Sequence, residues 1–546
     1  MIKTLKSSRL PAVGAAALLL VGGGLAYWLF SRNEPENWQT GAKYIPEEAL
    51  MTLSVSTDPQ QWQQLKSYGT SESRELLGEG LQSAADRLAT NYGYDYVEDI
   101  RPWVGDEVTI ALLPPPAEPD PNAPPLVPGE MQSAIAVLPI GKGNLAKELF
   151  AEASTSGSWE ERSYRGIDIR EAKDDADRTF STAILNNAVV VVGNRPQALE
   201  RAIDAYKDGK SISDAPGYDR AWESTLPETF FARAYFNLQT AFAALSETSI
   251  DPIAPEILAK LESQGLTTTV SLQSDGILFK NLSWLKSNSE TAYLGQNQAG
   301  KIVARLPGNT VMMMSGGNLE QLWKDYLQGA ESNPLAPGDP NWLRRALKST
   351  VDVDLEKDLL PWMTKEFALA MIPVEGEKAQ NFPGGVVLMV EAAKREDAEA
   401  LFEKLDGTMR EKYQYQVKEE KIGDRPVVNW TSLGGALTVT RGWLSDKIAF
   451  ISVGAPIIDG LIPQPADSLA ASDRFLGSVP LELQPNNGHF YLDLDGTINA
   501  EGFTLLQLPP AQKAFVSAIE SIGVTGAVQD KRHSQYDMFV KLKTDN

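Results

Sequence analysis

Residues 95–114 (DYVEDIRPWVGDEVTIALLP) match residues 354–373 (DLEKDLLPWMTKEFALAMIP), which lie 259 positions further along the chain. Seven residue types coincide at this one spacing without a gap; in the first copy they are Asp95, Asp99, Pro102, Trp103, Glu107, Ala111 and Pro114. Chance rarely gives so long an ungapped match. We therefore interpret the chain as an internal duplication.

The pattern extends outward from this stretch and predicts five segments: an anchor at 1–30, a stalk at 31–43, repeat one at 44–285, a linker at 286–300 and repeat two at 301–546. Apolar alternation predicts short strands at 49–56, 107–113, 133–139, 166–170, 179–185 and 188–193, and helical spacing predicts helices at 71–91, 145–153 and 197–206. The strands are mostly joined as hairpins, without regular βαβ alternation. This predicts an α+β fold with mainly antiparallel sheets and packed helices.

The two repeats differ in length at two predicted places. Residues 114–128 (PPPAEPDPNAPPLVP) form a proline-rich loop, and its counterpart at 373–383 is seven residues shorter. Proline cannot donate to a sheet ladder, so this loop is expected to be extended and exposed. Matching Gly193 to Gly454 then predicts a longer turn around Arg441, Gly442 and Trp443 in repeat two.

Residues 10–30 (LPAVGAAALLLVGGGLAYWLF) carry no charge and are long enough to cross a bilayer as one helix. Lys3, Lys6 and Arg9 precede them, which places the N-terminus in the cytoplasm and the body outside. The alternative is a cleaved signal peptide, because residues 24–26 offer small residues at a suitable spacing. The apolar run continues to Phe30, and we therefore favour an uncleaved anchor.

Composition narrows the possible functions. The chain has 50 Lys and Arg residues against 72 Asp and Glu residues, a formal charge of −22 that disfavours nucleic-acid binding. It contains no cysteine, which excludes disulfides, thiolate metal sites and cysteine nucleophiles.

No motif predicts a catalytic, cofactor-binding or metal-ligating residue, and no cofactor is expected. His489 and His533 are the only histidines, and neither has metal-ligand spacing. Ser283 and Lys286 form an S-x-x-K without the motifs that accompany it in serine hydrolases. Residues 141–143 (GKG) are interpreted as a turn.

Four further groups have a structural and a functional interpretation. Asp493, Asp495 and Gly496, with Asn499 and Glu501 downstream, only partly match a calcium loop. The matched carboxylates Glu107 and Glu366, and Asp99 and Asp358, could serve acid–base chemistry if buried, but a turn with a packed tryptophan is favoured. Asp174, Asp175 and Asp177 are expected at a hairpin tip, and Met312, Met313 and Met314 in a strand core.

The apolar N-terminal span, the YIPEEALMTLSV opening at 44–55 and the DIRPWVGDE entry at 99–107 resemble a family of membrane-anchored bacterial proteins. The family is frequent in cyanobacteria and catalogued as a domain of unknown function. The resemblance covers essentially the whole chain and implies no catalytic residues. For a cyanobacterial source, the body would lie in the periplasm or the thylakoid lumen.

Together these features predict a membrane-anchored binding or scaffold protein outside the cytoplasm. Its two lobes would form a platform or cleft for a protein partner or an apolar ligand. Two alternatives stay open: a carboxylate-dependent hydrolase, which needs converging carboxylates, and a lipid or pigment carrier, which needs a continuous apolar cavity.

Overall fold

The structure is a computed structural model. It describes residues 41–92, 96–115, 133–141, 159–173, 179–219, 222, 230–248, 258, 261–295, 298–332, 339, 341–376, 382–435, 437–497 and 510–544. The described part is an α+β fold in which every strand pairing is antiparallel. The chain divides into two compact units. Unit 1 is Met1–Pro252 with Gln264–Ser274 and Thr544–Asn546, and unit 2 is Ile253–Ser263 with Asp275–Lys543.

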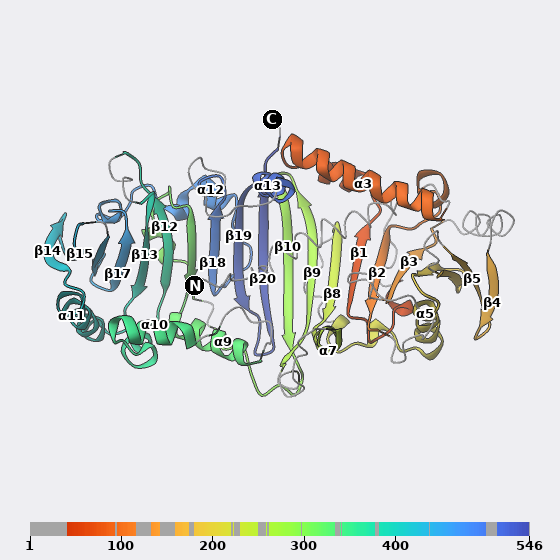
Figure 1. Ribbon diagram of the computed structural model, residues 1–546, viewed down its shortest axis with the longest axis horizontal. Helices are drawn as coiled ribbons and strands as arrows, with labels where there is room; N and C mark the ends of the chain where they lie inside the picture. The colour runs from red at the N-terminus through yellow and green to blue at the C-terminus, as the bar shows by residue number, and fades with distance from the viewer. Residues whose placement is uncertain are drawn as a thin grey trace, which may run out of the picture. The chain divides into compact units, whose positions relative to one another are not determined.

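Most strands of unit 1 are labelled in Figure 1. Their order across the sheet is β9 (Ser263–Gln273), β8 (Ala232–Asn237), β1 (Met51–Ser56), β2 (Glu107–Leu113), β3 (Ser133–Pro139), β7 (Val189–Gly193), β6 (Thr179–Leu185), β5 (Ile167–Lys173) and β4 (Glu160–Tyr164). Its helices are α2 (Pro59–Ser67), α3 (Ser71–Tyr92), α5 (Pro196–Asp208) and α7 (Leu238–Thr248), with a π-helix at Tyr96–Ile100 and 3-10 turns at Ala42–Tyr44 and Ile212–Asp214.

Local chemistry explains where these elements begin and end. Asp58 caps α2 by accepting the backbone N–H of Gln60 at 2.9 Å, and Pro59 follows at the first helical position. Pro196 begins α5, and Gly209 ends it in the left-handed conformation with φ 66°. Asn186 and Asn187 both have positive φ, as the tight turn between β6 and β7 requires.

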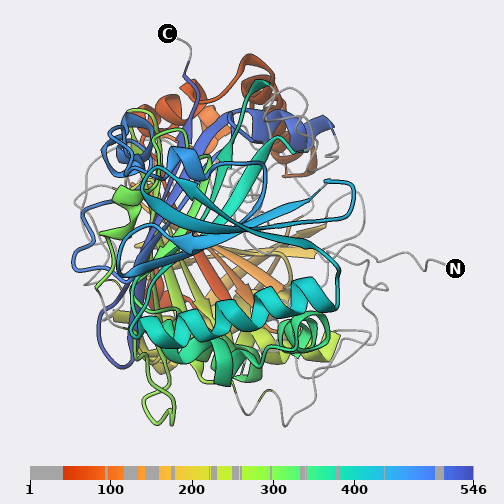
Figure 2. The same ribbon diagram turned by 90° about the vertical axis from the view of Figure 1, so that its left-hand side faces the viewer.

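Unit 2 has the strand order β10 (Gly276–Leu285), β20 (His533–Leu542), β19 (Ile519–Val528), β18 (Gly488–Asp493), β11 (Met312–Gly316), β12 (Phe367–Pro373), β13 (Gly384–Glu391), β17 (Ile448–Gly454), β16 (Thr438–Trp443), β15 (Arg425–Thr431) and β14 (Gln416–Ile422). Its helices are α9 (Leu319–Ser332), α10 (Asn341–Val351), α11 (Arg395–Glu411), α12 (Asp473–Leu476) and α13 (Pro510–Ser517). In Figure 2, α11 crosses the foreground beneath the strands at the β14 end of this unit.

From β19 to β14, the order of unit 2 matches the order of unit 1 from β9 to β4, strand for strand. The register matches as well at the centre. In unit 1, Thr52 lies between Ala111 and Tyr235, and in unit 2, Met313 lies between Ala370 and Tyr491. Ala111 and Ala370 are one of the pairs that match in the sequence.

The sheet of unit 2 has a core on each face. One core contains Met313, Ala370, Val387 and Phe450, packed under the segment from Ile457 to Val479. The other contains Val390, Trp430 and Trp443, packed under Leu401, Phe402 and Leu405 of α11. Alternating side chains therefore serve two separate cores, which explains why these strands are apolar almost throughout.

The predicted strands at 107–113, 133–139 and 179–185 are confirmed, and β2 and β3 form the expected hairpin. The difference in the proline-rich connection is also present. Thr109 pairs with Val137 and Ala368 pairs with Met389, separations of 28 and 21 residues along the chain. Residues 116–132 of that connection, and the predicted helix at 145–153, lie outside the described residues.

The prediction of a longer turn at Arg441, Gly442 and Trp443 is wrong, because these residues form the end of strand β16. The hairpins β6–β7 and β16–β17 have connections of equal length. Matching Gly193 to Gly454 also overstated the extra length of repeat two by two residues. The ladder from Thr109 through Val137 reaches Val191, and the ladder from Ala368 through Met389 reaches Phe450, so the two glycines stand two positions apart. A shift of two residues keeps a strand's inward face, and the apolar pattern does not reveal it.

Candidate functional site

The two Pro-Trp turns are structural. Trp103 and Trp362 are buried. The indole N–H of Trp103 donates to the carbonyl oxygen of Asp99 at 2.8 Å. Asp358 accepts the backbone N–H of Asp354 and an N–H of Lys404, and these contacts lower the pKa of Asp358. These aspartates therefore hold turns together, as the structural interpretation predicted.

The matched glutamates are separately partnered; Glu366 is buried and Glu107 is partly buried. Glu107 accepts a hydrogen bond from Arg233 at 2.5 Å, and burial raises the pKa of Glu107 although Arg233 opposes the rise. Glu366 accepts the backbone N–H groups of Lys301 and Ile302 at 3.0 and 2.8 Å, and burial likewise raises its pKa. Each glutamate ties its strand to a neighbouring segment.

The two histidines have different surroundings. His489 is buried, its Nδ1 lies 3.0 Å from Thr525 Oγ1, and burial lowers its pKa to about 4. His533 lies 2.8 Å from Asp530 at the start of β20. Ser283 contacts Ser534 at 3.0 Å within the paired strands β10 and β20. None of these contacts among the described residues forms a nucleophile–base pair.

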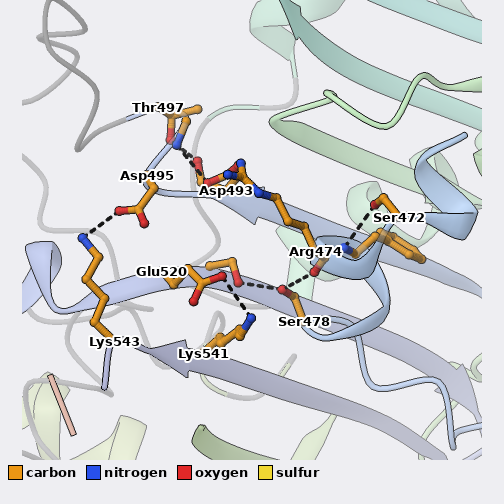
Figure 3. Close-up of polar contacts among 12 residues, drawn as sticks. Ser472, Arg474, Ser478, Asp493, Asp495, Thr497, Glu520, Lys541 and Lys543 are labelled. Carbon is orange, nitrogen blue, oxygen red and sulfur yellow. Dashed lines mark hydrogen bonds and ion pairs between the residues drawn. The ribbon is translucent and has the colours of Figure 1, made fainter. Parts of the chain in front are cut away.

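The aspartates that partly match a calcium loop are occupied by the chain's own cations (Figure 3). Asp493 is paired with Arg474 at 2.5 Å and also accepts the backbone N–H of Gly496. Asp495 is paired with Lys543 at 2.8 Å, and Glu520 lies 3.0 Å from Lys541. No cluster of three metal-ligating side chains occurs in the part of the chain that the structure describes. Asn499, Glu501 and the aspartates at 174, 175 and 177 lie outside it, as do residues 142–143.

The methionine cluster divides between the two faces of strand β11. Met313 is fully buried, as predicted for a strand core. Met314 is 37% exposed, so the core interpretation does not hold for it. Leu53 stands at the same place in the ladder of unit 1 and is 9% exposed. Met314 thus marks a part of unit 2 that its neighbours leave open.

Met314 belongs to a surface that we name the open apolar face. It consists of two rows of side chains on strands β19, β18, β11, β12, β13 and β17. Hydrogen-bonded register aligns the first row as Ile522, Leu492, Met312, Met371, Val386 and Val453. The second row is Val524, Phe490, Met314, Leu369, Leu388 and Ile451. None of these twelve residues is buried.

The open apolar face lies next to the part of the sheet that α11 covers. Val390 lies beneath α11, and Leu388 and Ile451 are only partly buried at the edge of that core. In the next row, Val386 and Val453 are 40% and 42% exposed. A contiguous exposed apolar surface of this kind marks interaction sites in soluble domains.

Sequence reasoning missed this surface. The strands are apolar on both faces, so their pattern does not say which face is covered. The available signal was the even-numbered set Met312 and Met314, which alternates with Met313. Reading that signal requires knowing that α11 stops short of these rows.

The fold and the open apolar face define an α+β protein of antiparallel sheets with a candidate binding surface. The chain belongs to the family described as "Protein of unknown function (DUF3352)", which matches residues 12–542. No curated protein matches the sequence.

Three solved structures of TP0453 are similar to part of the chain. Crystal form III has 9% identity and a TM-score of 0.25, and covers 46% of this chain and 81% of that chain. Form IV has 9% identity and a TM-score of 0.24, with coverages of 45% and 80%. Form I has 8% identity and a TM-score of 0.24, with coverages of 46% and 82%. At these TM-scores the likeness carries no conclusion about this chain.

Among the described residues, no helix is long and apolar enough to cross a bilayer. The predicted span at 10–30 lies outside them.

Proposed function

We propose that this chain is a single-span, membrane-anchored binding protein whose body lies outside the cytoplasm, and that the open apolar face of unit 2 is its binding surface. The observation that carries the proposal is the exposure of Met314, Val386 and Val453 on three strands of one sheet. Because these side chains are about 40% exposed, covering each one is worth roughly 0.6 to 1.2 kcal/mol of the about 1.5 to 3 kcal/mol for full burial. An occupant that covers the face recovers this free energy.

The anchor is supported by the uncharged run at 10–30 and by the basic residues before it. The body would lie in the periplasm or the thylakoid lumen. The high negative charge of the chain suits a well-solvated exported protein.

We also propose that the chain arose by duplication, with repeats at 44–285 and 301–546 and a linker at 286–300. The shared strand order and the matching register around Thr52 and Met313 support this proposal. The alternative of a carboxylate-dependent hydrolase gains no such support. Glu107, Glu366 and Asp493 each have a partner within the chain.

The absence of cysteine allows a direct test in native membranes, because one introduced thiol is the only thiol of the protein. The full chain carrying Val386→Cys is compared with Leu433→Cys, whose site is 78% exposed and lies in the turn between β15 and β16, outside the two rows. Both are treated with a membrane-impermeant maleimide in membranes opened by freeze–thaw, and again after purification.

If the face is occupied in the membrane, the thiol from Val386→Cys reacts at least fivefold faster after purification than before it. The thiol from Leu433→Cys reacts equally in both preparations. Equal reaction rates for Val386→Cys in the two preparations would overturn the proposed function.

A further inference from the structure

The open apolar face contains no polar side chain in either of its two rows. Its twelve residues are aliphatic, thioether or phenyl groups, without a hydroxyl, an amide or a charge. The backbone N–H and C=O groups of these strands are directed along the sheet into the ladders. The face therefore offers an occupant apolar contact and no hydrogen bond.

This chemistry distinguishes between occupants. A peptide segment laid on the face would bury backbone donors and acceptors without partners, at about 1 to 3 kcal/mol for each group. Specific protein interfaces usually provide about one hydrogen bond per 100 to 200 Å², and aromatic and arginine side chains are enriched in them. Arg441 continues the second row onto β16, but Asp406 accepts its hydrogen bonds. A hydrocarbon chain has no polar group that would lose its hydrogen bonds to water on this face.

The dimensions also suit a hydrocarbon chain. Six strands spaced about 4.8 Å apart give rows roughly 24 Å long. One leaflet is half of a hydrocarbon core about 30 Å thick, so one lipid chain extends about 15 Å. Each row is thus long enough for one extended chain. Methionine, which supplies Met312, Met314 and Met371, adapts its shape to flexible apolar ligands.

The predicted anchor places the body near a source of such chains. The described chain begins at residue 41, ten residues after the end of the span at 30. Ten extended residues reach at most about 35 Å. The body therefore stays within one protein diameter of the bilayer surface.

We infer that the open apolar face binds a hydrocarbon chain of a membrane lipid. This inference rests on the proposed function and names the ligand of the same surface. Because the rows carry no charge, the lipid is selected by its chain, and its head group stays in water.

The test uses the full chain reconstituted into phosphatidylcholine vesicles that contain a phosphatidylcholine with a photoactivatable diazirine in its acyl chain. Labelled peptides are mapped by mass spectrometry after illumination. Peptides from β11, β12, β13 and β17 are expected to carry the label, together with residues 10–30 as the internal positive control. Label confined to residues 10–30 would overturn the inference.

A double variant sharpens the test. Val386→Asp with Val453→Asp is expected to reduce labelling of the β11, β12, β13 and β17 peptides at least fivefold and to leave labelling of 10–30 unchanged. Leu433→Asp is the matched control and changes neither. Unreduced labelling in a folded double variant would count against the face. If the double variant does not fold, the wild-type map alone decides.

The two experiments distinguish failure of the lipid inference from failure of the proposed function. If the thiol from Val386→Cys is protected in native membranes while the photolipid labels only residues 10–30, the face binds an occupant other than a lipid, such as a protein. The lipid inference then fails and the proposed function stands. If the thiol from Val386→Cys is also unprotected, the lipid inference and the proposed function both fail.

Discussion

At the scale of single residues, the two units place different side chains at the same position in the sheet. Arg233 on β8 lies opposite Ser54 on β1, and His489 on β18 donates its backbone N–H to the hydroxyl oxygen of Ser315 on β11. In unit 1, Arg233 forms a buried ion pair with Glu107. In unit 2, Glu366 binds backbone N–H groups, so the histidine faces no carboxylate partner there. The same strand position is charged in one unit and neutral in the other.

The hydrogen bonds of His489 determine which ring nitrogen carries the proton. Thr525 Oγ1 donates its single proton to the carbonyl oxygen of Pro480. Thr525 Oγ1 must therefore accept from His489 Nδ1, which carries the proton of the neutral ring. In this arrangement His489 Nδ1 is the donor and does not act as a base toward Thr525.

His489 makes stability depend on pH. Its pKa falls from an ordinary value of about 6.5 to about 4 on folding, because burial disfavours the charged ring. The unfolded chain then binds more protons between these values, so this residue's contribution is present above pH 6.5 and is lost as pH falls toward 4. The loss is about 1.4 kcal/mol per pH unit, and about 3 kcal/mol in all.

The measurement is chemical denaturation of the wild-type protein and His489→Gln at pH 7.5, 5.5 and 4.5. The free energy of unfolding of the wild type should fall relative to that of the variant as pH decreases, because the variant lacks the titrating ring. A difference that stays constant over this range would show that His489 is not held neutral.

At the scale of elements, backbone conformation decides what a glycine contributes. Gly209 follows α5 with φ 66°, a conformation that residues with a Cβ avoid. Gly78 lies within α3, where an added Cβ would meet no atom within 4 Å. The first glycine is required by its geometry, whereas the second only weakens its helix.

Opposite effects on stability are therefore expected from the same substitution. Gly209→Ala should lower the free energy of unfolding by about 1 kcal/mol, and Gly78→Ala should raise it by about 0.5 to 1 kcal/mol. Urea denaturation of both variants against the wild type measures the two shifts. The same sign in both would contradict the assigned helix positions.

The strands and the hairpin of β2 with β3 could be predicted from the sequence better than the exact alignment of the two repeats. The match around Trp103 and Trp362 identified two copies of one turn, because an indole buried under a Pro turn allows few alternatives. The position of β16 was missed, because Gly193 and Gly454 both end strands but stand at different ladder positions. Local residue types specify turns more strongly than they specify strand register.

The open apolar face could not be predicted from the sequence. The sequence predicted that Met313 is buried, and it gave no means to predict that Met314 is exposed. That property depends on which segments pack over this face, and the cover that α11 gives to the neighbouring core is set by long-range packing of Phe402. Cover by another element is a tertiary property, which the periodicity of the strand does not contain.

At the scale of the whole molecule, the predicted anchor divides the chain between two compartments. Positive residues precede the span and the body carries the acidic excess. Topology can be measured with a protease added to sealed membrane vesicles. In right-side-out vesicles of the cytoplasmic membrane, the body should be degraded. In inverted vesicles, and in sealed thylakoids, it should be protected. Degradation in inverted vesicles alone would reverse the proposed orientation.

The protein combines the open apolar face with a charged strand at one edge of the sheet of unit 2. The outermost strand β14 carries Lys418, Glu419, Glu420 and Lys421, whose charges oppose pairing with another chain. The ammonium group of Lys418 lies 2.7 Å from the carboxylate of Glu420, and the two form an ion pair. The protein can therefore expose an apolar face without offering an uncharged edge at this end of unit 2.

The interleaving of the two units has a consequence for genetics. Unit 1 takes in Thr544–Asn546 from the end of the chain, and β10, which lies near the middle of the sequence, pairs with β20 near its end. A gene fragment that stops after residue 285 would encode β10 without its hydrogen-bonding partner β20. A nonsense mutation between residues 286 and 532 would thus remove β20 and leave one side of β10 without its partner strand, and complementation by two separately expressed fragments would need both to associate as they fold.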